Sequence, residues 1–241
     1  MKFRQLREDV CRVNQELVRV GLCTLTWGNA SAVDRRAGVM AIKPSGVDYA
    51  RLRPEDIVVL SLASGRVVDG ARRPSIDMPT HWHLLRSFPD IGGVVHTHSR
   101  HATAWAQARV PLPCFGTTHA DHFHGPVPVA RALTRAEVAG DYTRNTGVAI
   151  VDTFRRKKLD PLHMPAVLMP GHGPFAWGIS LRAALENAIA LEFVAQMALD
   201  TLALRPAAAP LSAQLLDKHF LRKHGPGASY GQPGTGSDAD Q

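Results

Sequence analysis

"GGVVHTHSR", residues 92–100, is a short apolar run that ends with two histidines one residue apart. Successive side chains of a β-strand point to opposite faces, so His96 and His98 share a face if this run is a strand. Two neutral imidazoles on one face can bind the same metal ion. Two unrelated surface histidines would give the same spacing, so the rest of the sequence has to distinguish these interpretations.

The segments around this run alternate between strand-like and helix-like patterns. Residues 3–20 carry apolar side chains at steps of three and four, which predicts a helix that ends at Gly21. The alternation predicts one α/β domain with a central sheet, mixed in direction but largely antiparallel, and helices on both faces. Further strands are expected within 39–46, 57–70, 91–99 and 165–169, and further helices at 78–88, 100–109, 134–158, 180–204 and 211–223.

Three segments are expected to depart from regular structure. "PGHGPFAWG", residues 170–178, is rich in Gly and Pro and predicts a loop. Thr146 and Gly147 allow an interruption of the helix expected at 134–158. The tail from Gly225 onward consists mostly of Gly, Pro, Ser and Asp, which predicts a mobile segment when the chain is alone.

With 241 residues, of which 45% are hydrophobic and 20% charged, the chain has the composition of an ordinary soluble globular protein. The first ten residues, "MKFRQLREDV", lack the apolar region of a signal peptide, and no stretch reaches the apolar length expected of a membrane span. Three scattered cysteines, Cys11, Cys23 and Cys114, have no metal-binding spacing. These features predict a reduced, cytoplasmic protein without a membrane partner.

The net charge of +7 indicates a preference for anionic partners, either nucleic acids or phosphorylated metabolites. The only dense basic run is "RRKK", residues 155–158, and no zinc-knuckle or RNP-type aromatic pattern accompanies it. We therefore interpret this run as a solvated helix face and expect no nucleic-acid partner.

A third histidine stands in a loop that suits a metal ligand. His172 lies between two glycines in "PGHGP", residues 170–174, where the backbone can approach a ligand closely. Together with His96 and His98 it makes a three-histidine set that leaves coordination positions open, as catalytic zinc sites do. Asp77, just ahead of a predicted helix, is either a fourth ligand or a helix cap.

Three short polar stretches have the composition of anion-binding turns: "TWGNAS" (26–31), "KPSG" (43–46) and "PSID" (74–77). Each combines small residues and hydroxyls with backbone N–H groups, which bind phosphate well in turns and at helix starts. Lys43 adds a full positive charge. Ordinary polar loops have the same composition, so none of the three is specific alone.

Two further segments contain candidate proton-transfer residues. "GTTHADHFHG", residues 116–125, holds Asp121 among three histidines, whose irregular spacing favours an acid/base aspartate over a second metal site. Tyr230 lies in "LLDKHFLRKHGPGASYGQ", residues 215–232. It is either a loosely packed aromatic residue or a proton donor delivered across a subunit boundary.

Six stretches, in order along the chain, are "TLTWGNASAVD", "IKPSGVDY", "IGGVVHTHSRHATAWAQA", "GTTHAD", "HGPFAWG" and "LLDKHFLRKHGPGASYGQ". With them the chain resembles the bacterial L-ribulose-5-phosphate 4-epimerases of the class II aldolase/epimerase superfamily, from about residue 5 to residue 232. The resemblance implies one class II aldolase-like domain over residues 1–232 and a disordered extension over residues 233–241.

The resemblance also implies roles for individual residues. Asp77, His96, His98 and His172 correspond to the metal ligands, with Zn²⁺ the expected ion and Mn²⁺ or Co²⁺ the alternatives. The two implied proton donors or acceptors are Asp121 and Tyr230, the tyrosine reaching in from a neighbouring subunit. The implied substrate-binding residues are Gly28, Asn29, Lys43, Ser45, Gly46, Ser75, Ile76, His219 and Arg222.

Two positions depart from the family pattern. Ile76 stands where a second serine is expected in "PSSD", so only its backbone N–H could serve a phosphate group. Thr143 and Arg144 stand where an acidic residue is expected. These departures leave the exact pentulose phosphate open.

The implied reaction is the metal-dependent epimerisation of L-ribulose 5-phosphate to D-xylulose 5-phosphate at C4. The C4 hydrogen is not acidic, so the similar enzymes break and remake the C3–C4 bond, with one group on each side to move a proton. Family members are homotetramers with active sites between subunits. A class II sugar-phosphate aldolase, or an epimerase of a related pentulose phosphate, is the alternative. A basic nucleic-acid-binding protein or a metal-storage protein would leave the other motifs without a role.

Overall fold

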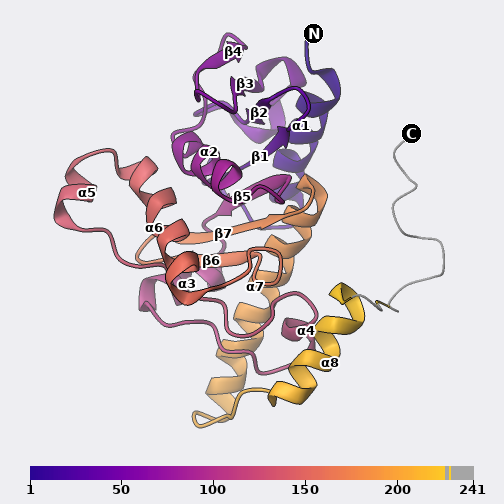
Figure 1. Ribbon diagram of the computed structural model, residues 1–241, viewed down its shortest axis with the longest axis vertical. Coiled ribbons are helices and arrows are strands. Elements are labelled where there is room, and N and C mark those ends of the chain that lie inside the picture. Colours follow the sequence, from indigo (N-terminus) through magenta and orange to yellow (C-terminus); the bar gives the residue numbers. More distant parts are fainter. Residues whose placement is uncertain (226–227, 229–241) are drawn as a thin grey trace.

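A seven-stranded sheet forms the centre of the molecule in a computed structural model that describes residues 1–225 and residue 228 (Figure 1). The strand order is β4-β3-β2-β1-β5-β7-β6, and each neighbouring pair is antiparallel, which confirms the expected central, largely antiparallel sheet. The strands are β1 (Gly28–Asp34), β2 (Val39–Ile42), β3 (Val58–Ser61), β4 (Val67–Asp69), β5 (Gly93–Thr97), β6 (Ala166–Met169) and β7 (Gly173–Gly178).

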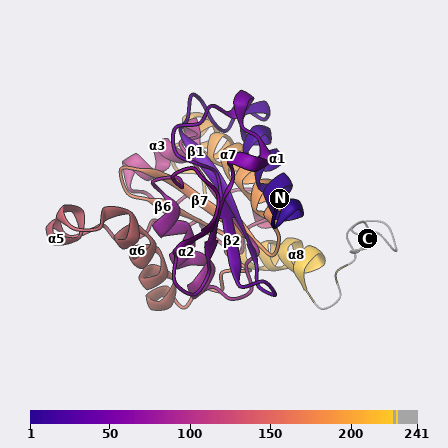
Figure 2. The same cartoon turned by 90° about the horizontal axis from the view of Figure 1, so that it is seen from above.

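Helices cover both faces of this sheet, as expected. The helices α1, α3 and α7 pack on one face, and α2 and α6 pack against each other on the opposite face (Figure 2). The helices are α1 (Arg4–Arg19), η1 (Tyr49–Arg51), η2 (Pro54–Asp56), α2 (Met78–Ser87), α3 (Arg100–Ala108), α4 (Thr117–Ala120), α5 (Arg135–Ala139), α6 (Tyr142–Lys157), α7 (Leu181–Leu204) and α8 (Ala213–His224).

Aromatic side chains fix α2 and α6 on β7. The ring centroid of Trp177 lies 5.4 Å from that of Phe88 and 5.2 Å from that of Phe154. Trp177 is fully buried, and such aromatic contacts stabilise a core beyond the area that they bury. Asp77 and Tyr142 lie at the N-terminal ends of these two helices, so this packing positions both residues on the sheet.

Two segments expected to be turns or loops are strands. Residues 28–31 of the predicted anion-binding turn belong to β1, and most of the loop predicted at 170–178 forms β7. Each of these strands has an antiparallel neighbour on both sides: β1 pairs with β2 and β5, and β7 pairs with β5 and β6. Their composition favours a loop, but hydrogen bonds to two partner strands outweigh a weak local preference.

The helix expected at 134–158 is interrupted, but at Gly140 and Asp141, between α5 and α6, and not at Thr146 and Gly147. Helix α6 runs unbroken through both residues. A Cβ atom at Gly147 would lie 2.9 Å from the Cβ of His83 and 3.2 Å from the backbone oxygen of Thr80, both in α2. The glycine therefore permits close packing of two helices rather than ending one.

Helix α7 is long and apolar enough to cross a membrane, judged by its length and composition alone. The prediction that no stretch reaches this apolar length is therefore wrong. The core helix of a soluble protein passes the same test. Here α7 packs along β5 and β7 and contacts α1 and α3. Several large apolar side chains of α7, including Phe193 and Leu204, nevertheless remain exposed in the single chain.

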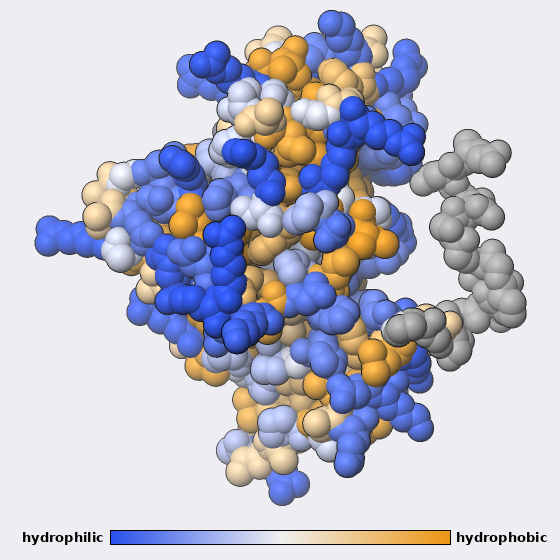
Figure 3. Space-filling model, viewed as in Figure 1, coloured by the Kyte–Doolittle hydropathy of each residue, from blue (hydrophilic) through white to orange (hydrophobic). Residues whose placement is uncertain are grey.

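The basic run at 155–158 ends α6, and each of its residues is exposed. Figure 3 shows hydrophilic residues gathered over α5 and α6 on this side of the molecule. The interpretation of this run as a solvated helix face is confirmed.

Candidate active site

Three histidines from two distant segments meet at the end of β5. His96 lies in β5, His98 follows the end of that strand, and His172 lies between β6 and β7. Their ring centroids are 4.7 to 5.0 Å apart, and one nitrogen from each lies within 4.8 Å of the others. In the part of the chain that the structure describes, this is the only group of three such side chains that could hold a metal ion.

Hydrogen bonds orient two of these rings. The Nδ1–H of His96 donates to the carbonyl oxygen of Pro174 at 2.9 Å, which leaves Nε2 available as a ligand. Nδ1 of His172 lies 3.2 Å from the hydroxyl of Tyr142, the first residue of α6. No sequence pattern predicted this role for Tyr142, because Tyr142 and His172 are thirty residues apart and lie in different elements.

The triad is electrically neutral at physiological pH. Burial lowers the pKa of all three histidines, and it lowers the pKa of His172 to about 3. The negative charge of Asp77 opposes this shift but does not overcome it. Neutral imidazoles present a lone pair without first losing a proton, which suits metal binding.

Asp77 lies beside this triad and is not a helix cap. It precedes α2, but its side chain makes no capping hydrogen bond. The carboxylate instead accepts a 2.7 Å hydrogen bond from the side-chain amide of Asn29. Burial alone would raise the pKa of Asp77, but His96, His81 and the Asn29 hydrogen bond together lower it. Asp77 is therefore ionised and adjacent to the histidines, and its coordination of a metal stays a prediction.

The three predicted anion-binding stretches come together in the fold. The backbone N–H of Ser75 donates to the carbonyl oxygen of Lys43, and the Asn29 amide donates to the Ser75 hydroxyl at 3.0 Å. The backbone N–H of Ser45 donates to Arg73, next to the third stretch. Gly46 follows with a φ of 67°. These contacts join residues 28–29, 43–46 and 74–77 into one surface that lies next to Asp77 and the metal candidates.

Ile76 is the exception within this surface, because it is a large apolar residue that is 73% exposed. Its neighbours Ser75 and Asp77 point their polar groups at Asn29, whereas the isoleucine adds only apolar surface. The position expected to hold a hydroxyl therefore offers none.

Asp121 belongs to a second cluster, between α4 and α8 (Figure 1). Its carboxylate accepts hydrogen bonds from His219 at 3.1 Å and Arg222 at 3.2 Å and lies 3.5 Å from Lys223. Burial alone would raise the pKa of Asp121, but these groups outweigh it and lower the pKa. Asp121, His219 and Arg222 thus lie together, and among the described residues no hydrogen bond or ion pair joins Asp121 to the triad, so their implied roles stay predictions. Tyr230 lies outside the described residues.

The three histidines closest to Asp121 in the sequence have partners of their own. His119 bonds to the backbone of Gly125, His122 faces Asn187, and His124 pairs with Asp217 at 2.7 Å. These partners orient the three rings separately.

Glu192, which the sequence analysis also missed, fixes the segment that follows His98. This residue of α7 accepts hydrogen bonds from the backbone N–H groups of His101 at 2.8 Å and Ala102 at 3.0 Å. It also accepts one from the imidazole of His101 at 2.7 Å. The N-cap residue Ser99 makes no side-chain cap, so a carboxylate from another helix stabilises the start of α3.

We expect Glu192→Ala to lower the free energy of unfolding by about 3 kcal/mol, because two partly buried hydrogen bonds lose their charged acceptor. Burial raises the pKa of Glu192, but its hydrogen bonds outweigh burial and lower it. The folded state therefore favours the ionised form, and its stabilisation is lost as pH falls through the lowered pKa. Urea denaturation of both proteins at neutral pH and under acidic conditions should show the difference shrinking in acid.

Glu186→Ala is the matched control, because Glu186 pairs on the surface of the same helix with Arg182. The Glu186→Ala substitution should lower the free energy of unfolding by less than about 0.5 kcal/mol. Equal destabilisation by the two substitutions would contradict the capping role of Glu192.

Known proteins resemble this chain in sequence and in fold. The sequence model of the class II aldolase and adducin N-terminal domain matches residues 8–199. The chain belongs to the class II aldolase family. Members of this family are metal-dependent, and the three histidines could hold such an ion.

Relatives with the same fold include epimerases and aldolases. This class II aldolase-family chain is 49% identical over 230 residues to the L-ribulose-5-phosphate 4-epimerase UlaF of Salmonella paratyphi C, covering 95% of this chain and all of the relative. The same enzyme of Salmonella typhi is 48% identical over the same shares of both chains.

Among solved structures, an L-fuculose 1-phosphate aldolase superposes with a TM-score of 0.77 at 26% identity, covering 91% of this chain and 96% of that one. The L-fuculose-1-phosphate aldolase of Thermus thermophilus superposes with a TM-score of 0.65, also at 26% identity, covering 86% and 99% of the two chains.

Proposed function

We propose that this chain is an L-ribulose-5-phosphate 4-epimerase, which converts L-ribulose 5-phosphate to D-xylulose 5-phosphate. The observation that carries the proposal is 49% identity to a protein of that name over its whole length. The neutral histidine triad beside an ionised aspartate and a polar, lysine-containing surface supports it independently. The aldolases that share the fold are about half as similar in sequence.

His96, His98 and His172 would hold the divalent ion, with Asp77 as the fourth ligand and Zn²⁺ as the proposed ion. When bound, such an ion acts as a Lewis acid toward the oxygens of the sugar and lowers the barrier to cleavage of the C3–C4 bond. Asn29 keeps the Asp77 carboxylate in a fixed orientation through its 2.7 Å hydrogen bond. The chain thus supplies a rigid ligand set and an adjacent polar surface for the substrate.

The surface around Lys43 and Ser75 would bind the phosphate group of the substrate. Lys43 supplies positive charge, and Ser45 and Ser75 supply hydroxyls. Cleavage of the C3–C4 bond would leave two fragments in the site, the enediolate of dihydroxyacetone and glycolaldehyde phosphate. The aldehyde group of glycolaldehyde phosphate must rotate before the bond forms again. A site that binds the phosphate group firmly allows this rotation and prevents the aldehyde fragment from dissociating. The two fragments then rejoin faster because they stay close together.

Asp121 would accept or donate one of the two protons that the reaction moves, and Tyr230 the other. The lowered pKa of Asp121 keeps its carboxylate ionised at neutral pH, so it is ready to accept a proton from the C4 hydroxyl. Because Asp121 contacts α8 and not the triad in one chain, we propose that subunits of a cytoplasmic homotetramer complete each other's sites. The exposed Phe193 and Leu204 on α7 support such an assembly.

The direct test is a coupled assay of the purified protein with L-ribulose 5-phosphate that follows D-xylulose 5-phosphate. Conversion should stop after chelation and return when zinc or manganese is added back. Release of free dihydroxyacetone and glycolaldehyde phosphate would indicate an aldolase instead. A metal-loaded protein that catalyses neither reaction would exclude both substrate assignments.

Ile76→Ser should lower KM for L-ribulose 5-phosphate several-fold without a comparable change in kcat. The exposed isoleucine stands between two polar residues of the phosphate surface, and a serine would add a donor to the charged phosphate. The matched control is Val138→Ser, which replaces another exposed apolar side chain, in α5, and should leave KM unchanged. An increase in KM for Ile76→Ser would show that the isoleucine contacts the substrate favourably.

A further inference from the structure

A buried tyrosine contacts two of the three stretches that form the phosphate surface. Tyr49 begins the short helix η1 and is almost fully buried. Its hydroxyl donates a 2.6 Å hydrogen bond to the backbone carbonyl of Gly28, the first residue of β1. The ammonium nitrogen of Lys43 lies over its ring, 4.6 Å from the centroid. One side chain thereby connects residues 28–29 to residues 43–46.

The contact with Gly28 matters because this residue has little room to move. Its φ is +132°, and a Cβ atom there would lie 2.6 Å from the sulfur of Cys23 and 2.7 Å from the backbone oxygen of His96. The next residue, Asn29, donates the hydrogen bond that orients Asp77. The Tyr49 hydroxyl therefore helps to fix the backbone that carries Asn29 into the phosphate surface.

The contact with Lys43 matters because this lysine is buried. Among its described hydrogen bonds, the ammonium group has one acceptor, the carbonyl oxygen of Pro44 at 3.3 Å. Burial lowers the pKa of Lys43, and the nearby groups Cys23 and Asp48 oppose that shift. The face of an aromatic ring attracts a desolvated cation, so the Tyr49 ring stabilises the charged form and limits the positions that the amine can adopt.

We propose that Tyr49 is a positioning residue that holds Lys43 and the Gly28–Asn29 backbone at the spacing that a sugar-phosphate group requires. This inference rests on the proposed function, since it names a support for the same site. Tyr49 does not transfer a proton in the reaction, because its hydroxyl is committed to a backbone carbonyl and burial raises its pKa far above the ordinary value.

Two substitutions separate the two contacts. Tyr49→Phe keeps the ring next to Lys43 and removes the hydroxyl, whereas Tyr49→Leu removes both. We expect the Kd for inorganic phosphate, measured by calorimetry, and the KM for L-ribulose 5-phosphate to rise about fivefold in Tyr49→Phe, the factor of one typical hydrogen bond. Both should rise tenfold or more in Tyr49→Leu. The affinity for Co²⁺, measured by titration, and kcat should stay within about twofold in Tyr49→Phe.

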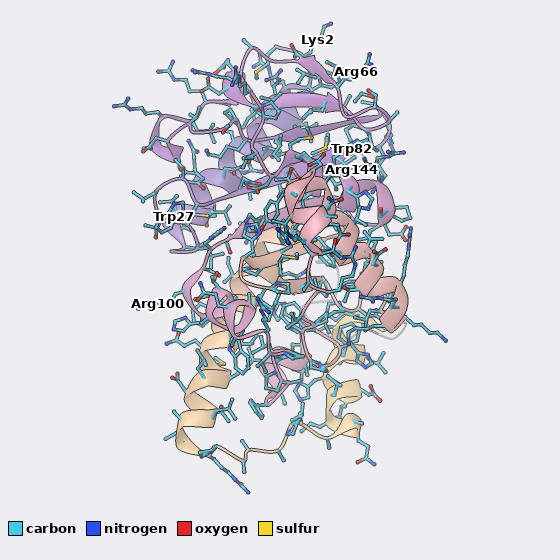
Figure 4. The ribbon with its side chains drawn as sticks, turned by 90° about the vertical axis from the view of Figure 1, so that its left-hand side faces the viewer. Lys2, Trp27, Arg66, Trp82, Arg100 and Arg144 are labelled. Atoms are coloured by element: carbon cyan, nitrogen blue, oxygen red, sulfur yellow. The ribbon has the colours of Figure 1, made fainter. Side chains whose placement is uncertain are left out.

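Trp82→Phe is the matched control. The Trp82 indole N–H donates to the backbone oxygen of Leu62 at 2.8 Å, and the guanidinium of Arg86 lies over its ring at 4.7 Å. It thus makes the same two kinds of contact as Tyr49, but it lies well apart from Trp27, which directly precedes Gly28 (Figure 4). We expect the Trp82→Phe protein to have a lower free energy of unfolding and an unchanged Kd for inorganic phosphate.

Unchanged phosphate affinity in both Tyr49 variants, an equal loss in Trp82→Phe, or no phosphate binding by the wild-type protein would each overturn the inference. A wild-type protein that binds phosphate but does not convert the sugar would overturn the proposed function alone. The role of Tyr49 would then be decided by the phosphate Kd of the variants.

Discussion

The His98→Ala variant is expected to bind no divalent metal. Its kcat with L-ribulose 5-phosphate should fall by a factor of at least about 10³. The variant removes one of three neutral imidazoles whose ligand nitrogens lie within 4.8 Å of one another. A bound ion contributes several kilocalories per mole to such a reaction, and each 1.4 kcal/mol corresponds to a factor of ten in rate. Metal content by mass spectrometry and steady-state kinetics with added zinc or manganese measure the two effects.

His98 is the best of the three histidines for this experiment, because it is the most exposed of them, whereas His96 is almost fully buried. Its removal leaves no cavity in the core, so a folded but metal-free protein is expected. The matched control is His163→Ala, which removes an exposed histidine near Asp160 and should retain the metal and the activity. Full activity of a metal-free His98→Ala protein would rule out metal-dependent catalysis.

Asp121→Asn is expected to lower kcat by about 10²–10⁴-fold, the range typical of a general acid or base. Asparagine has the same shape as aspartate, but it cannot accept the proton of the C4 hydroxyl. The metal affinity should not change, because the contacts of Asp121 go to His219, Arg222 and Lys223 of α8. Stopped-assay kinetics and a Co²⁺ titration of the variant separate the two quantities.

Asp217→Asn controls for a general loosening of α8. Asp217 pairs with His124 at 2.7 Å and thus makes a second carboxylate–histidine contact between α8 and residues 116–125. Its substitution should leave kcat nearly unchanged. If both variants lose activity equally, the effect comes from the docking of α8 and not from proton transfer.

The pH dependence gives a further readout of the same Asp121→Asn experiment. The pKa of Asp121 lies below its ordinary value, so the wild-type carboxylate stays ionised through the neutral range and is protonated only in acid. Activity that depends on this base is present above the lowered pKa and falls as the pH passes below it. The residual activity of the variant should lack this acid limb.

Local patterns in the sequence were sufficient for the elements near the site. A period of two predicted that His96 and His98 share a face; β5 contains His96 and ends one residue before His98, and the two ring centroids lie 5.0 Å apart. The steps of three and four predicted α1 within one residue at each end. Such patterns are reliable because they arise from the geometry of a single element, which needs no knowledge of its neighbours.

The predictions that failed concern segments whose structure depends on distant partners. Residues 28–31 and 173–178 have loop-like composition but form strands, because the first segment pairs with β5 along its whole length and the second pairs with β5 and β6. Gly147 has the lowest helix preference short of proline, yet it remains helical because α2 packs closely against it. Composition carries no information about these neighbours.

The sequence by itself predicted the three-histidine set of His96, His98 and His172 and determined the family to which the chain belongs. Only the tertiary structure decided that Asp77 is oriented by Asn29 and does not cap its helix, and that Tyr49 connects Gly28 with Lys43. It also showed that the described contacts of the Asp121 carboxylate go to His219 and Arg222 of α8 and not to the three-histidine set. The physical reason is distance along the sequence. Residue types and periodic patterns reflect the chemistry of neighbouring residues. The hydrogen bonds of Tyr49, Asn29 and Asp121 instead join residues 21 to 101 positions apart, so their geometry depends on how the whole chain packs.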